Sequence, residues 1–212
     1  SLSSSLKALE DQLGVQLVRR GSRYRGLTPE GERVLDWARR IVGDARTMQA
    51  ELRARRTGVT GRLRLGVIPT AMPRIAGLTA PFLARHPGAE VAILSRSADE
   101  IRDQIAALEL DAGVTYLDSE PLGRVQVLPL YRETYCLISR DEDRGPVGWA
   151  EAARRPLCLL TPDMQNRRIV DSLLAAAGGP PKPTLESNSM IVLFTHVRTG
   201  LWSSVMPAML AD

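Results

Sequence analysis

The sequence has few of the features that would indicate a secreted, membrane-spanning or disulfide-rich protein. Its 212 residues include two cysteines, Cys136 and Cys158, too few for the disulfide framework of a small secreted domain. Both lie in apolar runs predicted as strands, so we expect buried thiols, with a regulatory disulfide as the alternative. No apolar run approaches the ~18 residues that span a bilayer, and no signal peptide opens the chain. These absences favour a cytoplasmic protein without a membrane partner.

Histidine is equally scarce, and the patterns typical of enzymes are missing. His86 precedes a proline in a predicted turn and His196 lies inside a predicted helix, so neither has metal-ligand spacing. There is no Gly-x-Ser-x-Gly nucleophile elbow and no glycine-rich phosphate loop. A nucleophilic Cys158 paired with a distant histidine is the alternative, but its apolar context, Pro-Leu-Cys-Leu-Leu, indicates a buried thiol. We predict a protein that is not an enzyme, with no metal site and no cofactor.

The excess positive charge lies near the N-terminus. Residues 1–57 hold 12 of the 28 Lys and Arg residues and 7 of the 24 Asp and Glu residues, a net charge of +5. The remainder of the chain has a net charge of −1. A small basic module followed by a near-neutral larger one indicates a polyanionic partner for the first module only. Because basic helices are often simply solvated, this signal needs support from others.

Residues 29–57 are predicted to form one long amphipathic helix. Thr28 suits the N-cap, Pro29 suits the first helical position, and Glu30 and Glu32 place negative charge at the positive end of the helix dipole. Apolar residues then recur at alternating spacings of four and three: Val34, Ala38, Ile41, Ala45, Met48 and Leu52. Such a seam is typical of a helix that packs against another, and we interpret the segment as a dimer-forming linker. A helix packed on its own domain is the alternative.

A shorter helix is predicted before it, from the start of the chain to Leu13, with Gly14 as its stop. One face is apolar: Leu2, Leu6, Leu9 and Leu13. The opposite face has small polar groups and one cation: Ser3, Ser4 and Lys7. Such a surface fits a DNA major groove, where hydroxyls contact bases or phosphates. A solvated face is the alternative.

Between these helices the sequence predicts a basic β-turn. Apolar residues on either side indicate short strands, with a turn at Gly21 and Ser22. Four arginines cluster there: Arg19, Arg20, Arg23 and Arg25. Two strands around a basic turn form a β-wing that can lie along a phosphate backbone or reach into the minor groove.

This order of elements resembles the second half of the winged helix-turn-helix of LysR-type transcriptional regulators, a bacterial family. The resemblance covers Ser1 to about Leu35, including Leu-x-x-Leu-Glu-x-x-Leu-Gly-Val-Gln-Leu, the Arg-Gly-Ser-Arg wing and the Thr-Pro-Glu-Gly cap. It implies that the first helix is the recognition helix. It further implies DNA contacts from four residues: Ser3, Ser4, Lys7 and, on the wing, Arg23. Ser4 stands where a basic residue is frequent in the family. The family's leading helices have no counterpart in this sequence, which also lacks an initial Met, so we expect a fragment or a partly built chain.

Strand-like and helix-like segments alternate after the glycine-flanked linker Gly58–Gly61. Strands are predicted at 62–68, 90–94 and 111–116, and helices at 75–85 and 97–108. This alternation predicts a parallel sheet with helices on both faces. A second unit begins near Arg132, with strands at 133–138, 156–160, 183–186 and 201–206, and helices at 149–154, 167–177 and 189–198. Two tandem α/β units place strand ends and helix starts around one crevice, where ligands bind in open sheets.

This half resembles the effector-binding domain of the same regulators, a fold similar to periplasmic solute-binding proteins. The resemblance rests on Gly-Arg-Leu-Arg-Leu-Gly-Val, His-Pro-Gly-Ala-Glu-Val and the run from Ser97 to Leu-Glu-Leu-Asp-Ala-Gly-Val. It implies an effector pocket between two subdomains, with these candidate contacts: Thr70, Ser97, Thr115, Thr161 and Asn188. Hydroxyls and amides at helix starts suit a carboxylate or another small anion. Simple capping or strand-end roles are the alternative for each residue.

The predicted fold is therefore mainly α/β. A partial winged helix-turn-helix (1–28) is followed by a linker and dimerisation helix (29–57) and by two periplasmic-binding-protein-like effector subdomains (58–131 and 132–212, the second incomplete). We predict a homodimeric or tetrameric regulator whose partners are double-stranded promoter DNA and a small, anionic effector. A periplasmic-type solute receptor without DNA-binding function is the alternative. A purely structural dimer is a third possible function. The basic front end disfavours the receptor, and the wing arginines disfavour the structural dimer.

Overall fold

The structure is a computed structural model that describes residues 2–19, 26–117, 125–140, 145–179 and 181–211; for residues 53–57 only the backbone is described. Its residues group into two compact units. The first comprises Ser1–Thr60 and Ala106–Leu108, and the second comprises Gly61–Ile105 and Glu109–Asp212. Near the boundary, Gly58 (φ 74°) and Gly61 (φ 100°) adopt left-handed conformations that glycine tolerates without a Cβ penalty.

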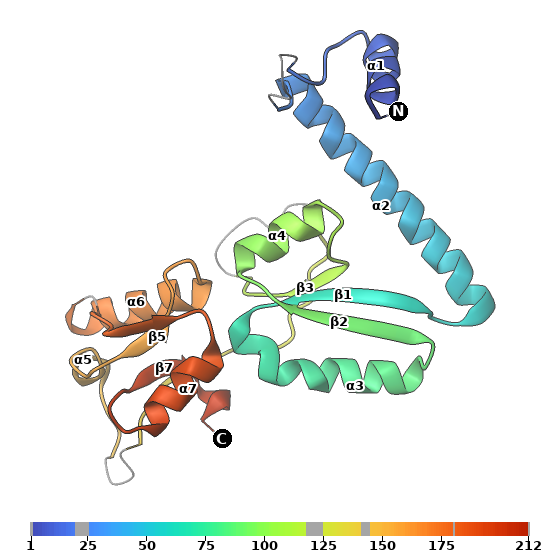
Figure 1. Ribbon diagram of the computed structural model, residues 1–212. Coiled ribbons are helices and arrows are strands. Elements are labelled where there is room, and N and C mark those ends of the chain that lie inside the picture. Colours follow the sequence, from blue (N-terminus) through green and yellow to red (C-terminus); the bar gives the residue numbers. More distant parts are fainter. Residues whose placement is uncertain (1, 20–25, 118–124, 141–144, 180, 212) are drawn as a thin grey trace. The chain divides into compact units, whose positions relative to one another are not determined.

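Within the described residues, the first unit contains two helices (Figure 1). Helix α1 (Leu2–Leu13) is followed by Gly14, whose N–H donates to the carbonyl of Glu10 over 2.8 Å. Val18 and Leu27 then form an isolated antiparallel bridge, and α2 (Pro29–Thr57) follows. Both predicted helices are confirmed, and the bridge occupies the position of the predicted wing strands. The basic turn itself lies outside the described residues.

The start of α2 is fixed by the predicted cap. The N–H of Gly31 donates to Thr28 Oγ1 over 2.9 Å, and Thr28 Oγ1 in turn donates to the carbonyl of Gln16 over 2.6 Å. The N–H of Thr28 also donates to the carbonyl of Leu17 over 3.0 Å. The cap therefore satisfies an orphan helix N–H and ties the helix start to the segment that precedes it.

Glu10 is a buried charged residue in this unit, with a relative exposure of 6%. Its Oε1 accepts the N–H of Leu17 over 2.8 Å and that of Val18 over 3.2 Å. Burying a carboxylate is costly unless it is hydrogen-bonded, and these two bonds provide partners. Glu10 thus holds the connection after α1 in place where it turns toward α2.

The second unit begins with a three-stranded parallel sheet in the order β2-β1-β3. Its strands are β1 (Gly61–Val67), β2 (Ala89–Ser95) and β3 (Ala112–Val114). Helix α3 (Ile75–Arg85) lies on one face and α4 (Ala98–Ala106) on the other (Figure 1). The predicted parallel sheet with helices on both faces is confirmed. A short 3₁₀ helix, η1 (Pro69–Arg74), directly follows β1 where the sequence indicated only a strand end.

The described part of the second subdomain contains two two-stranded sheets. Strand β4 (Tyr135–Ile138) pairs antiparallel with β7 (Ser204–Pro207), and β5 (Cys158–Leu160) pairs parallel with β6 (Leu185–Ser187). The helices are α5 (Trp149–Ala152), α6 (Gln165–Gly178), α7 (Met190–Arg198) and the 3₁₀ helix η2 (Ala208–Leu210). Each predicted strand and helix is present, with bounds shifted by a few residues. The antiparallel pairing of β4 and β7 was not predicted, because alternating elements alone do not specify which strands meet.

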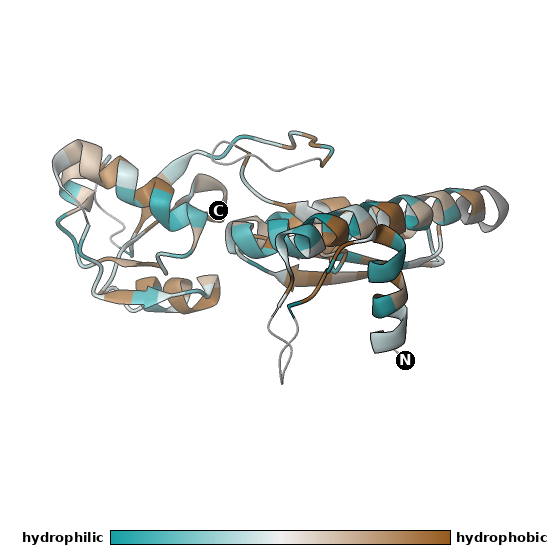
Figure 2. Ribbon diagram, turned by 90° about the horizontal axis from the view of Figure 1, so that it is seen from above, coloured by the Kyte–Doolittle hydropathy of each residue, from teal (hydrophilic) through white to brown (hydrophobic). Residues whose placement is uncertain are grey.

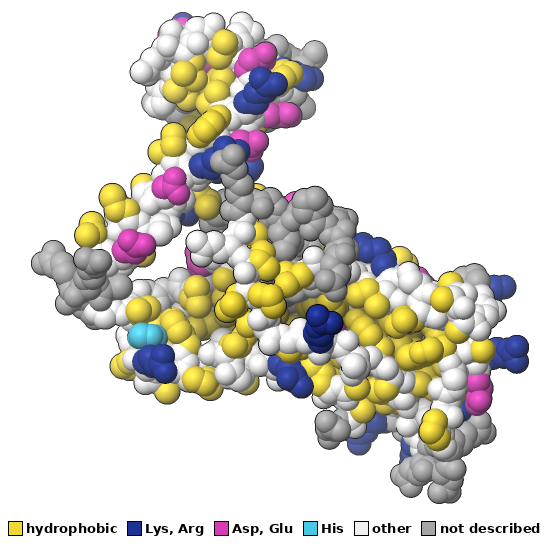
Figure 3. All heavy atoms as spheres, turned by 180° about the vertical axis from the view of Figure 1, so that it is seen from behind, with side chains coloured by type: hydrophobic (Ala, Val, Ile, Leu, Met, Phe, Trp, Pro, Cys, Tyr) yellow, Lys and Arg dark blue, Asp and Glu magenta, His cyan; other side chains and the backbone are white. Residues whose placement is uncertain are grey.

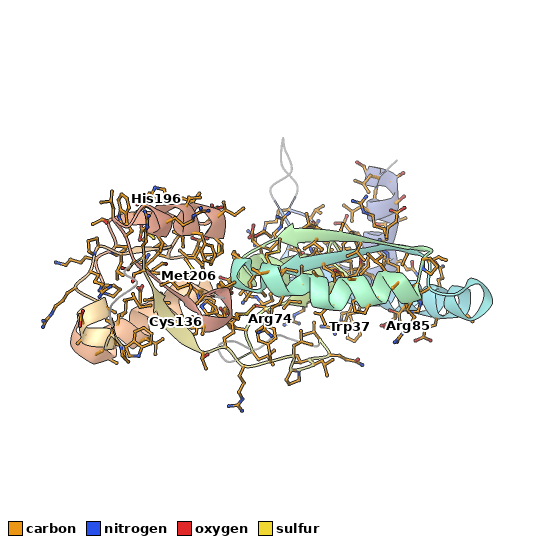
Figure 4. All side chains as sticks on the ribbon, turned by 90° about the horizontal axis from the view of Figure 1, so that it is seen from below. Trp37, Arg74, Arg85, Cys136, His196 and Met206 are labelled. Atoms are coloured by element: carbon orange, nitrogen blue, oxygen red, sulfur yellow. The ribbon has the colours of Figure 1, made fainter. Side chains whose placement is uncertain are left out.

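Hydrophobic side chains form separate cores in the two subdomains. The first core packs β1 against α4, with Val67 and Ile101 almost fully buried. The second subdomain has two clusters, centred on Leu159 with Leu174 and on Cys158 with Leu193. Cys136 and Met206, labelled in Figure 4, are register partners on β4 and β7. No disulfide joins the two cysteines: Cys158 is buried, as predicted, whereas Cys136 is half-buried.

Helix α2 exposes much of its apolar surface. Hydrophobic and hydrophilic residues intermix along it in Figure 2, and Figure 3 shows hydrophobic side chains along its length. The large apolar side chains that are exposed there are Leu35, Trp37, Ile41, Val42, Met48 and Leu52. Across the parts of the chain that the structure describes, no helix is both long and apolar enough to cross a membrane.

Candidate ligand pocket and nucleic-acid interface

A small pocket lies where the two subdomains of the second unit meet. It encloses about 200 Å³ of space, part of it open to solvent. The first subdomain contributes Ile68, Pro69, Thr70, Ser97, Ala98 and Tyr116, and the second contributes Leu160, Met164, Gln165 and Asn166. The lining is half apolar and half polar, and none of these side chains is charged. The pocket therefore offers hydrogen bonds and helix dipoles to a ligand, but no direct ion pair from its lining.

The start of α4 forms one wall and is a complete capping box. The N–H of Glu100 donates to Ser97 Oγ over 3.2 Å, and the N–H of Ser97 donates to Glu100 Oε2 over 2.8 Å. This reciprocal pair satisfies two backbone donors at the helix start. Ser97 is thus both a cap and a pocket-lining residue, so the two alternatives that the sequence left open are compatible.

The start of α6 forms the opposite wall. Its N-cap residue, Met164, makes no side-chain capping hydrogen bond, and the first turn contains no acidic residue. The positive end of this helix dipole is therefore not offset by a local carboxylate in its own first turn. Gln165 and Asn166, in this turn, are buried and line the pocket.

Arg167 anchors the first turn of α6 from behind the pocket. Its side chain is buried, donates to the carbonyl of Leu160 over 2.9 Å, and forms ion pairs with Asp171 and Glu186. Burial alone would lower the pKa of the Arg167 guanidinium, but these two carboxylates raise it above its ordinary value. The cation is therefore permanent and is engaged in structure, linking β5, α6 and β6.

A chain of hydroxyl groups crosses from one subdomain to the other beside the pocket. Thr70 Oγ1 and the Tyr116 hydroxyl lie 2.9 Å apart, and the Tyr135 hydroxyl donates to that of Tyr116 over 3.1 Å. Asn166 Nδ2 donates to the Tyr135 hydroxyl over 3.4 Å. Glu133 Oε2 is a second acceptor for Tyr135, also at 3.4 Å. Because Thr70 and Asn166 both line the pocket, both ends of the chain reach it.

Burial governs the ionisation of the two phenols. It raises the pKa of Tyr116 well above the ordinary value, an effect that the hydrogen bond with Thr70 opposes. Burial also raises the pKa of Tyr135 to about 12, while its hydrogen bonds with Tyr116 and Asn166 oppose the shift. Both side chains are therefore neutral phenols at physiological pH and can both donate and accept hydrogen bonds.

The structure brings together some of the predicted pocket residues. Thr70 and Ser97 line the pocket. Thr115 and Thr161 are the chain neighbours of lining residues, and their buried hydroxyls have no hydrogen-bond partner among the described residues. Asn188 is exposed between β6 and α7 and is not part of the lining.

Sequence reasoning missed Tyr116, Met164, Gln165 and Asn166. Tyr116 is the last residue of the strand predicted at 111–116 and could have been found at this strand end, as Thr115 was. The other three lie before the helix predicted to begin at Arg167, whereas α6 begins at Gln165. The missing capping side chain removed the signal that would have located this helix start.

Three of the four predicted DNA-contacting residues lie on the N-terminal helix. Ser3, Ser4 and Lys7 are exposed on α1. Arg23 lies outside the described residues. The predicted seam residues Ala38, Ile41, Ala45, Met48 and Leu52 are exposed on α2, and Val34 is half-buried. Ile41 is 66% exposed and Met48 56%, so the described residues of this chain leave these large apolar side chains largely uncovered.

Comparison with known proteins identifies the family. The family profile described as LysR substrate binding domain matches residues 56–212. A probable hydrogen peroxide-inducible genes activator of Streptomyces viridosporus is 32% identical over 215 residues, covering 98% of this chain and 68% of that protein. This chain belongs to the LysR family. Its relatives are transcriptional regulators, and no finding supports a periplasmic-type receptor.

Solved structures of LysR regulators share the fold. Full-length OxyR from Pseudomonas aeruginosa, in a cysteine-to-aspartate variant, superimposes with a TM-score of 0.73 at 25% identity, covering 100% of this chain and 70% of that one. Full-length CbnR, solved with its target DNA, gives a TM-score of 0.61 at 24% identity, covering 99% of this chain and 73% of that one. The predicted fold class is therefore confirmed, and the winged helix-turn-helix is only partly covered by this chain.

Proposed function

We propose that this chain acts as a DNA-binding transcriptional regulator of the LysR family, controlled by a small effector bound between its two α/β subdomains. The pocket is the observation that carries the proposal. Both subdomains line it, and it lies within the region that matches the LysR substrate binding domain.

The effector we propose is anionic, as the helix starts of the pocket suggest. The start of α6, where the N-cap residue Met164 makes no side-chain hydrogen bond, carries the positive end of a helix dipole, which favours carboxylates and other oxyanions. The start of α4 favours an anion less, because Asp99 and Glu100 are already in its first turn. We therefore place the negative group at α6. The candidate contacts remain Thr70, Ser97, Thr115, Thr161 and Asn188, the last of which would need to move to reach the pocket.

The proposed DNA-binding surface is the exposed polar face of α1 together with the wing. Ser3, Ser4 and Lys7 provide hydroxyl and cationic donors for a groove, and Arg23 provides a phosphate contact. The CbnR structure was solved with target DNA, which supports DNA as the partner for a chain of the same fold. Such a regulator works in the bacterial cytoplasm, and we propose no catalytic activity for it.

The exposed seam of α2 is proposed to pair with the same helix of a second subunit. Two copies of the seam would cover the apolar side chains that one chain leaves in solvent. Effector-dependent closure of the subdomains would then act through Gly58–Gly61 on α2 and change how the two DNA-reading modules are spaced.

A peroxide response is named for some relatives, and we propose that this chain does not share it. Cys158 is fully buried, its thiol donates to the carbonyl of Leu193, and burial raises the pKa of that thiol. Cys136 is half-buried on β4, and neither cysteine lines the pocket. Because the thiolate is the species that reacts with peroxide, these surroundings favour ligand binding over thiol oxidation as the input.

A gel-shift titration tests the DNA-binding half of the proposal. The full-length protein should bind DNA from its own promoter with a sequence preference, and its affinity should fall as salt rises. Lys7→Ala and Arg23→Ala should each weaken binding to all sequences and lower the salt slope by about one unit. Lys182→Ala, at an exposed position in the second unit, is the matched control and should change nothing. The proposal fails if binding shows neither a salt dependence nor a sequence preference.

A further inference from the structure

Arg74 connects three segments of the second unit that are far apart in the sequence. It is the last residue of η1, in the first subdomain, and its side chain is labelled in Figure 4. Its Nε donates to Met209 Sδ, in η2 of the second subdomain, over 3.0 Å. Its guanidinium carbon also lies 5.1 Å from the centre of the Tyr131 ring. One exposed side chain therefore contacts two partners outside its own subdomain core.

Tyr131 belongs to the crossover segment, residues 125–134, which leads into β4. Within the described residues, no helix or strand includes this segment. Its apolar side chains are largely exposed, with Val127 at 48% and Leu128 at 78%, so a hydrophobic core does not hold it. The N–H of Ala208, in η2, donates to the carbonyl of Thr134 over 2.7 Å. The crossover segment and η2 are thus already joined, and Arg74 ties both of them to η1.

The 3₁₀ helix η1 depends on such contacts because its own hydrogen bonds are weak. It is six residues long, and 3₁₀ hydrogen bonds have poorer geometry than α-helical ones. Pro73, inside it, has no N–H to donate. Pro69 and Thr70, at its first turn, line the pocket, whereas Arg74 ends it. Contacts at the Arg74 end therefore help to fix the end that forms the pocket wall.

The two partners of Arg74 set how strong this connection is. Burial raises the pKa of Tyr131, and Glu133 raises it further while Arg74 opposes the shift, so the ring is a neutral phenol at physiological pH. A cation near the face of a neutral aromatic ring is attracted by the ring quadrupole, and a thioether sulfur is a weak acceptor. At an exposed site such a cation–π contact changes an equilibrium constant about two- to fivefold. A connection of this size is reversible, and ligand binding can shift it.

We propose that the contacts of Arg74 with Tyr131 and Met209 form a clasp, which holds η1 against the crossover segment and η2 and favours the arrangement of the two subdomains in which the pocket is formed. Arg74 does not line the pocket and is a positioning residue that acts through η1. A ligand bound between the subdomains keeps the clasp closed, whereas opening of the clasp releases the pocket wall. This role rests on the proposed function, because it assumes that the effector occupies this pocket.

Amide hydrogen exchange in the full-length protein tests the clasp. The reporters are the N–H groups of Ile75, at the end of η1, and of Ala208, in η2, both of which are hydrogen-bonded. Arg74→Ala should speed the exchange of both about two- to fivefold, because exchange follows the opening equilibrium. Arg74→Lys keeps the charge but loses the planar guanidinium and should fall between alanine and the wild type. Arg85→Ala, at an exposed position in the last turn of α3, is the matched control and should change nothing.

Changes on the other two segments separate a clasp from a local effect of Arg74. Tyr131→Ala and Met209→Ala should each speed the exchange of the Ile75 amide, although neither residue belongs to η1. Tyr131→Phe keeps the aromatic ring and should match the wild type. Combining Arg74→Ala with Tyr131→Ala should speed exchange by less than the product of the two single effects, since both remove the same contact.

Acetate, as a small carboxylate probe, tests the connection between the clasp and the pocket. At ten times its dissociation constant, acetate should slow the exchange of the Ile75 and Ala208 amides about tenfold, because it binds the closed arrangement. Neither residue lines the pocket, so acetate does not protect these amides by covering them. Ala98→Leu fills the pocket and should abolish both the binding and the slowing.

Each failure has a separate meaning. If none of the alanine variants at Arg74, Tyr131 and Met209 changes the Ile75 amide, the clasp is overturned. An effect of Arg74→Ala that the other two variants do not share would confine Arg74 to η1, with the same consequence. If acetate binds in the pocket but leaves both amides unchanged, the clasp is not connected to the pocket, and the proposal fails while the effector site stands. If acetate does not bind, or still binds to Ala98→Leu, the proposed effector site fails, and exchange in the variants still decides whether the clasp exists.

Discussion

Gly31, in the first turn of α2, lies directly against the backbone carbonyl of Leu17, so a Cβ at position 31 would overlap that oxygen. The N–H of Thr28 binds the same carbonyl, which leaves the loop no room to move away. Gly31→Ala should therefore lower the free energy of unfolding of the first unit by about 1–3 kcal/mol, the usual cost of overpacking. Urea unfolding followed by circular dichroism measures it.

Gly43→Ala is the matched control within the same helix. A Cβ there would make only ordinary van der Waals contact. Replacing a mid-helix glycine with alanine removes backbone entropy from the unfolded state, so this variant should be more stable by about 0.5–1 kcal/mol. If both variants lose the same free energy of unfolding, the close approach between Gly31 and Leu17 does not cause the loss in Gly31→Ala.

The buried carboxylate of Glu10 gives the second prediction. Glu10→Ala leaves the N–H groups of Leu17 and Val18 without their acceptor and should cost about 2 kcal/mol of unfolding free energy. Glu10→Gln keeps an oxygen in the same place and should recover at least half of that loss. Because this connection leads into the proposed wing, the alanine variant should also bind promoter DNA more weakly in gel shifts. An alanine variant as stable as the wild type would contradict this role.

The third prediction concerns the α2 seam. Ile41→Glu or Met48→Glu should convert the oligomer to smaller species in sedimentation velocity, because pairing would bury an unpaired carboxylate. Ala50→Glu places the same charge on the opposite side of the helix and should leave the oligomer intact. If the Ile41→Glu protein sediments like the wild type, the seam is not the interface.

The fourth prediction concerns redox insensitivity. Hydrogen peroxide at concentrations that do not unfold the protein should leave promoter binding unchanged, since Cys158 is buried and its thiol has a raised pKa. A Cys136→Ser, Cys158→Ser double variant should behave like the wild type with and without peroxide. A peroxide-dependent shift that the double variant abolishes would establish thiol sensing instead.

The fifth prediction is a pH dependence at the alkaline end. The folded protein holds the Tyr135 proton up to a pKa of about 12, whereas an unfolded phenol releases it near 10. The associated stability is therefore complete below pH 10 and is lost as pH rises from about 10 to 12. After allowance for the partial exposure of this group, we expect a loss of about 1–2 kcal/mol across that interval. Tyr135→Phe should show a smaller loss in urea unfolding, and an equal loss would contradict the assignment.

Local sequence patterns were sufficient for most secondary structure. The Thr28 cap and the charge pattern after it predicted α2 to within a residue, because capping chemistry lies within a few residues of the helix it starts. The start of α6 was placed two residues late, since Met164 offers no capping oxygen. The antiparallel pairing of β4 with β7 was missed because it joins segments that are far apart in the chain.

The sequence alone determined the family, the order of elements, the basic front end and the apolar seam of α2, because each depends on periodicity or short-range spacing. Only the tertiary structure decided which side chains share the pocket. Four separate segments contribute the hydroxyl and amide groups beside the pocket: Thr70, Tyr116, Tyr135 and Asn166. Their spacing along the sequence follows no pattern that would indicate that they meet. Their hydroxyl and amide groups meet because the two subdomains fold separately and then pack, which brings buried polar atoms within hydrogen-bonding distance.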